Sequence, residues 1–96
     1  MNRAQVLSQL AQSKPTLVAR FGVTDLALFG STVRDAARAD SDIDILVSFD
    51  GPATSQRFFG VQFFLEDLLG RPIDLVTDKA LRPELRPFIE KEAVHV

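Results

Sequence analysis

Three short apolar runs, separated by segments of helical character, constrain the fold of this chain more than any other feature. They cover residues 26–29, 43–49 and 72–77. Their content of Val, Ile, Leu and Phe is typical of buried strands. Because these runs alternate with helical patterns, we expect an α/β or α+β fold in which helices cover a small sheet.

The helical segments are recognised by apolar spacing and by Gly and Pro at their ends. Residues 55–69 form the strongest candidate, with Ser55 as a possible N-cap and Gly70 just beyond the end. The remaining predicted helical segments are residues 2–13, a second short helix from Pro15 to Phe21 closed by Gly22, one or two turns within 32–38, and a tail over 81–92 interrupted by Pro83 and Pro87.

Length and composition narrow the classes of function. Ninety-six residues predict one domain, 1–96. A net charge of -2 argues against direct binding of a nucleic-acid backbone, and no apolar stretch approaches the ~20 residues of a membrane span. Because the chain has no cysteine and one histidine, His95, thiolate catalysis and His-pair zinc sites are excluded. We expect a cytoplasmic protein without a membrane partner.

Three aspartates are the strongest candidates for catalysis. Asp42 and Asp44 are two residues apart at the start of the run 43–49, so a strand would project both carboxylates to one face. Neighbouring carboxylates repel each other unless a cation lies between them. The simpler interpretation is a pair of hydrated aspartates at a strand end. Asp74 favours the metal site, because it lies between Ile73 and Leu75 in another apolar run, where an unpartnered charge is costly.

Three such carboxylates on neighbouring strands could bind two divalent metal ions, about 3.5–4 Å apart. Magnesium is the expected metal, since it takes carboxylates together with the phosphates of a substrate.

The segment after the first strand supplies candidate phosphate ligands. Gly30 lets the backbone approach phosphate oxygens closely, and Ser31 adds a hydroxyl donor. Arg34, one helical turn further, could neutralise a phosphate through two parallel hydrogen bonds. A Gly-Ser pair alone is usually only a turn. Its place between an apolar strand and an Asp-x-Asp strand makes it informative.

Gly30-Ser31-x-x-Arg34, followed by Ser41-Asp42-x-Asp44, resembles the signature of the DNA-polymerase-β-like nucleotidyltransferase superfamily. The small size and the order of elements resemble its minimal, MNT-type branch. The resemblance implies a twisted mixed sheet flanked by helices. Asp35 departs from the pattern, because many relatives have glycine after the arginine.

The resemblance also implies roles for the individual residues. Ser31 would bind the triphosphate, and Asp42 and Asp44 would each ligate both metals. Asp74 would ligate one metal and help to deprotonate the acceptor hydroxyl. Many minimal members act as the antitoxin of a HEPN-domain toxin, and some transfer AMP from ATP to a tyrosine of that partner. The chain has no tyrosine, so such an acceptor must lie in another molecule.

A pair of phenylalanines indicates a contact surface. On a helix over 55–69, one apolar stripe should face the core; it comprises Phe58, Val61, Phe64, Leu65, Leu68 and Leu69. Phe59 and Phe63 fall on nearly the opposite side, and exposed aromatic pairs are typical of partner-binding surfaces. The alternative is a helix that is buried on two sides.

We therefore predict a magnesium-dependent enzyme that transfers AMP from ATP to a hydroxyl group of a HEPN toxin. Two alternatives stay open. The chain could be a catalytically silent antitoxin that neutralises its partner by binding alone, or it could transfer a nucleotide to a small molecule. The three aspartates argue against the first alternative, and a length of 96 residues leaves little room for a small-molecule acceptor domain.

Overall fold

A four-stranded mixed sheet forms the centre of the protein in the computed structural model, which describes residues 2–34 and 41–96. The strands lie in the order β3-β2-β1-β4. β1 pairs antiparallel with β2 and β4, whereas β2 and β3 run parallel. Their bounds are β1 (Val23–Phe29), β2 (Ile43–Phe49), β3 (Ile73–Thr77) and β4 (Val94–His95). The predicted α+β class with a small mixed sheet is confirmed.

The N-terminal region is one helix, α1 (Arg3–Phe21), so the prediction of two helices separated at Pro15 is wrong. Proline removes one helical hydrogen bond, but Pro15 is exposed, where water can satisfy the carbonyl that it leaves free. Leu10 and Leu17 are fully buried on either side of it and hold the helix against the sheet. Gly22 ends the helix in the left-handed conformation, as predicted.

The helix α2 (Ser55–Leu69) has the predicted bounds, and Gly70 is its C-cap. Its N-cap is Thr54 rather than Ser55, because the Thr54 hydroxyl accepts a hydrogen bond from the backbone N–H of Arg57, at 3.2 Å. The predicted apolar stripe faces the core except at Leu68, which is 39% exposed.

The tail differs from the predicted helix over 81–92. A 3₁₀ turn, η1 (Asp78–Ala80), precedes a shorter helix, α3 (Arg86–Glu92). Pro83 has no N–H to donate and disfavours helical backbone before it, whereas Pro87 lies in the first turn of α3, where proline is tolerated. β4 was not predicted at all. Of the helical turns predicted within 32–38, residues 32–34 form turns and the rest lie outside the described residues.

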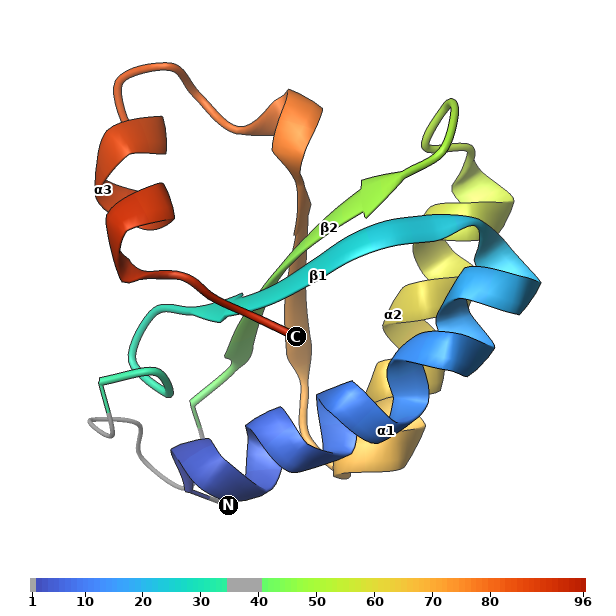
Figure 1. Cartoon of the computed structure of the whole chain (residues 1–96), viewed down its shortest axis with the longest axis horizontal. Helices are drawn as coiled ribbons and strands as arrows, with labels where there is room; N and C mark the ends of the chain where they lie inside the picture. Colours follow the sequence, from blue (N-terminus) through green and yellow to red (C-terminus); the bar gives the residue numbers. More distant parts are fainter. Residues whose placement is uncertain (1, 35–40) are drawn as a thin grey trace.

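The helices lie on both faces of the sheet (Figure 1). α1 and α2 cover one face, where the buried side chains of β2 are Ile43, Ile45 and Val47. Leu46 belongs to a smaller core cluster on the other face, which Ile89 of α3 covers. Asp44 alternates with the first set along β2 and therefore lies on the α3 face. No helix within the described ranges is long and apolar enough to cross a membrane.

Candidate active site

Asp44 and Asp74 lie side by side at the centre of the candidate site. They are directly paired in the parallel register of β2 and β3. Each alternates with core residues of its own strand, so both carboxyl groups project from the face that carries α3. The sequence predicted that Asp44 projects away from the core residues of its own strand, and the register of β2 and β3 brings Asp74 beside it.

The proximity of these carboxyl groups perturbs the titration of Asp44. The pKa of Asp44 rises from its ordinary value of 3.8 to about 6. Desolvation by burial is the largest cause, followed by the negative charge of Asp74 and a hydrogen bond between the two carboxyl groups. The charges of Asp42 and Glu92 contribute in the same direction. The site therefore concentrates negative charge where a cation would be favoured.

Asp42 precedes β2 and is exposed, so it is not within the strand as predicted. Its neighbourhood is fixed by contacts between the two parallel strands. The backbone N–H of Ile43 donates to the carbonyl of Pro72 at 3.0 Å, and the Arg71 guanidinium donates to the carbonyl of Ser41. These contacts fix the backbone on either side of Asp42, while its side chain is exposed to solvent.

Gly30 ends β1 directly against Asp44. Its φ of 76° lies in the left-handed region that favours glycine, and Phe29, the residue before it, pairs with Asp44 across the sheet. A Cβ atom at position 30 would overlap the Asp44 carboxylate. Glycine is therefore required here both by the backbone and by the approach of the acid. Ser31 follows in the same turn and is half-buried.

Arg34, the third predicted phosphate ligand, forms an ion pair with Glu92, the last residue of α3. The Arg34 side chain is 59% exposed and that of Glu92 is 24% exposed. No sequence motif marked Glu92 as part of the site. The sequence feature that could have marked Glu92 is its position at a helix C-terminus, where the helix dipole favours a basic residue over an acidic one.

Oxygen donors of this kind fit a hard divalent cation such as magnesium. Among the described residues, however, no group of three or more His, Cys, Asp or Glu side chains is arranged to hold a metal ion without rearrangement. Asp42 is exposed, and triphosphate oxygens supply much of the coordination in such sites. The assignment of Asp42, Asp44 and Asp74 as metal ligands stays a prediction.

The predicted partner-binding residues lie elsewhere. Phe59 and Phe63 are 49% and 60% exposed on α2, and their rings stack with centroids 6.1 Å apart. The helix therefore presents them to solvent, as its spacing predicted. They belong to the α1–α2 layer, so they do not adjoin the Asp44–Asp74 pair. Their role in binding stays a prediction.

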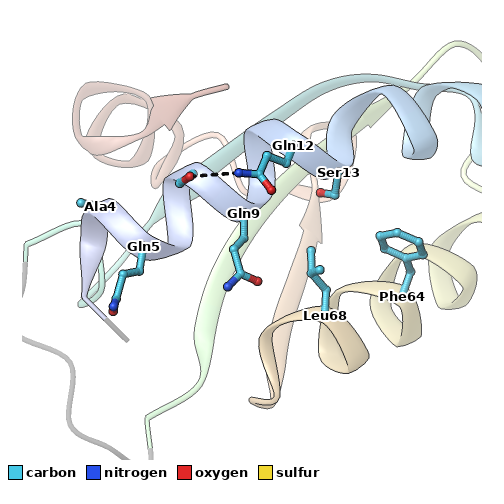
Figure 2. A pocket seen from close by; sticks show the side chains of 8 residues that line it. Ala4, Gln5, Gln9, Gln12, Ser13, Phe64 and Leu68 are labelled. Carbon is cyan, nitrogen blue, oxygen red and sulfur yellow. Dashed lines mark hydrogen bonds between the residues drawn. The ribbon is translucent and has the colours of Figure 1, made fainter.

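A cleft of about 750 Å³ lies between α1 and α2. Figure 2 shows polar side chains of α1 on one wall and two apolar side chains of α2 on the other. It contains none of the predicted site residues, and its lining has no titratable group that could transfer a proton. Its lining residues are Ala4, Gln5, Ser8, Gln9, Gln12, Ser13, Phe64 and Leu68. The predicted catalytic carboxylates therefore lie outside this cleft.

A turn with a left-handed glycine, next to paired acids on adjacent strands, indicates an enzyme of the phosphoryl- or nucleotidyl-transfer class. Comparison with known proteins gives the family. Residues 10–96 match the nucleotidyltransferase domain family, and the chain belongs to it. It is a nucleotidyltransferase, as its sequence predicted.

Individual relatives agree with this family. The protein adenylyltransferase MntA of Thermococcus cleftensis is 38% identical over 96% of this chain and 93% of its own length. A solved structure assigned as a minimal nucleotidyltransferase is 34% identical, with a TM-score of 0.83 over 98% of this chain and 95% of its own. A complex of a tri-AMPylated HEPN toxin with its MNT antitoxin, from Shewanella oneidensis, matches with a TM-score of 0.60. That match is 19% identical over 98% of this chain and 67% of the other, so it shows the fold alone.

Proposed function

We propose that this chain is a protein adenylyltransferase that moves AMP from ATP to a hydroxyl group of a HEPN-domain toxin and thereby acts as its antitoxin. The observation that carries the proposal is the Asp44–Asp74 pair, set directly against the obligatory Gly30. The relative at 38% identity bears the name protein adenylyltransferase, which supports AMP as the transferred group.

The residues of the site divide into two sets in this proposal. The Gly30 turn, the Ser31 hydroxyl and the Arg34 guanidinium bind the triphosphate through hydrogen bonds and charge. Asp42, Asp44 and Asp74 would hold magnesium, with two ions expected. Magnesium, when bound, supplies positive charge that offsets the charge developing on the phosphate oxygens.

The reaction itself is a displacement at phosphorus. The acceptor hydroxyl oxygen forms a bond to the α-phosphorus of ATP, and the bond from that phosphorus to the oxygen bridging to the β-phosphate breaks. Pyrophosphate leaves with the electron pair of that bond. Asp74 accepts the proton of the hydroxyl group. Most of the catalysis is positioning and electrostatic stabilisation, because phosphoryl groups need little covalent help from the protein.

The acceptor is proposed to be a tyrosine of the partner. This chain has no tyrosine, so it cannot serve as its own tyrosine substrate. Similar solved structures include a tri-AMPylated HEPN toxin in complex with its MNT antitoxin and a toxin–antitoxin pair with AMP-PNP, which supports a HEPN partner and ATP as the donor. The exposed Phe59–Phe63 pair is proposed as a contact surface for the toxin, on the opposite layer from the site.

Intact-mass analysis tests this function. The purified chain is mixed with the product of the neighbouring gene, magnesium and ATP. We expect the neighbour to gain one or more AMP units, and we expect no gain with Asp44→Asn. No adduct from a chain that still forms a tight complex would favour the catalytically silent antitoxin. A gain that persists unchanged with both Asp42→Asn and Asp44→Asn would contradict the assigned site.

A further inference from the structure

Glu92 lies close to the candidate site, but the proposed reaction assigns it no role. It adds a fourth carboxylate to a region that already repels the negatively charged triphosphate. It also ends α3, where an acid is disfavoured by the helix dipole. Two unfavourable electrostatic terms at one position indicate that the side chain has a compensating role. Among the residues that the structure describes, its ion-pair partner is the guanidinium of Arg34.

The backbone of Glu92 is held from both sides. Before it, Ile89 packs into the core cluster that contains Phe29, the last residue of β1 before Gly30. After it, Val94 pairs with Leu28 of β1. Glu92 is therefore attached to the same strand that ends in the phosphate-binding turn. With its side chain 24% exposed, it approaches Arg34 from a fixed support.

Arg34, unlike Glu92, is not held by a helix or a strand. It lies in a turn, and its side chain is 59% exposed. A long side chain of this kind loses rotational freedom when it binds a ligand, which weakens binding. An arginine has five N–H donors in a planar fork. A carboxylate that engages one terminal nitrogen leaves the other donors available for phosphate oxygens.

We propose that Glu92 is a positioning residue for the triphosphate: its carboxylate holds Arg34 beside the Gly30–Ser31 turn, with the remaining N–H donors free for phosphate. The inference rests on the proposed function, because it takes Arg34 as a phosphate ligand. The opposing role would be competition between Glu92 and the triphosphate for Arg34. The two roles predict opposite changes in affinity.

Titration calorimetry of magnesium-ATP into the purified chain separates them. Glu92→Ala should weaken binding about two- to tenfold, which corresponds to freeing one long side chain. Glu92→Gln should bind within about twofold of the wild type, because its amide oxygen still accepts from Arg34. Glu90→Ala is the matched control, since Glu90 lies on the same helix and pairs with Arg86 at 3.1 Å. It should leave the affinity unchanged.

A double-mutant cycle tests whether Glu92 acts through Arg34. Arg34→Ala combined with Glu92→Ala should bind no more weakly than Arg34→Ala alone. In transfer assays, Glu92→Ala should raise the KM for ATP and leave kcat nearly unchanged. Tighter binding by Glu92→Ala, an unchanged affinity, or additive losses in the double variant would each overturn the proposal while leaving the transfer activity of the wild type standing. A wild type that transfers no nucleotide would instead overturn the proposed function and this inference with it.

Discussion

Replacing Asp44 with asparagine should stabilise the nucleotide-free protein while abolishing its activity. Asp44 has a raised pKa, so the folded protein binds a proton at this site more tightly than the unfolded chain does. The stability that this proton supplies is fully present below pH 3.8 and is lost as the pH rises through about 6. Above that pH the wild type must keep a repelled, partly desolvated carboxylate. An asparagine removes that charge, and its amide can donate to Asp74.

The size of the stabilisation expected for Asp44→Asn follows from the raised pKa of Asp44. A rise from 3.8 to about 6 corresponds to about 3 kcal/mol if none of it is screened. Asp44 is only half-buried, so solvent screening reduces this figure to about 1–2 kcal/mol. For a chain of 96 residues, this corresponds to a rise of roughly 5–15 °C in the melting temperature at pH 8.

Urea unfolding at several pH values from 8 to 5, without magnesium or nucleotide, measures the effect. The gap in unfolding free energy between Asp44→Asn and the wild type should be largest at pH 8 and should shrink as the pH falls toward 5. Asp67→Asn, at an exposed position of α2, controls for the loss of one negative charge. A gap that is absent at pH 8, or independent of pH, would refute the reasoning.

Three further changes test other parts of the account. Gly30→Ala, with Gly70→Ala as its control, places alanine in left-handed backbone, which costs about 1 kcal/mol of stability in each variant. Only the alanine at position 30 overlaps Asp44, so urea unfolding should show a further loss of about 1–3 kcal/mol for Gly30→Ala. Transfer assays should likewise show a loss of activity for Gly30→Ala alone. Phe63→Ser should weaken the complex with the partner in a pull-down titration but change the unfolding free energy by less than about 1 kcal/mol, since the ring is 60% exposed; an unweakened complex would count against this surface. Pro15→Ala should stabilise the chain by about 1–2 kcal/mol in thermal unfolding by restoring a helical hydrogen bond, and destabilisation would show that proline is needed there.

Local patterns were sufficient for much of the fold. The apolar runs at 43–49 and 72–77 became β2 and β3 with nearly the predicted bounds, because burial on a sheet needs little more than a short apolar segment. The spacing of α2 also predicted the exposure of Phe59 and Phe63. Pro15 misled the prediction of α1, because tertiary packing of the buried residues on either side outweighs one lost hydrogen bond.

Long-range contacts could not be predicted from local patterns. β4 has two residues and no apolar run of its own; its pairing with β1 alone makes it a strand. Arg34 and Glu92 are 58 residues apart, and no spacing rule connects them. The direct pairing of Asp44 with Asp74 required the register of the parallel strands, whereas alternation gave only the face on which Asp44 lies. The roles of the three aspartates in metal binding stay predictions.

The central claim is that this acidic site catalyses the transfer of AMP from ATP to the partner protein. The most direct test uses two samples of ATP, one labelled at the α-phosphorus and one at the γ-phosphorus, incubated with the chain, magnesium and the partner protein. The account predicts that the α-label alone becomes bound to the partner, and that Asp44→Asn abolishes this labelling. Transfer of the γ-label, or α-labelling that is unchanged in Asp44→Asn, would contradict it.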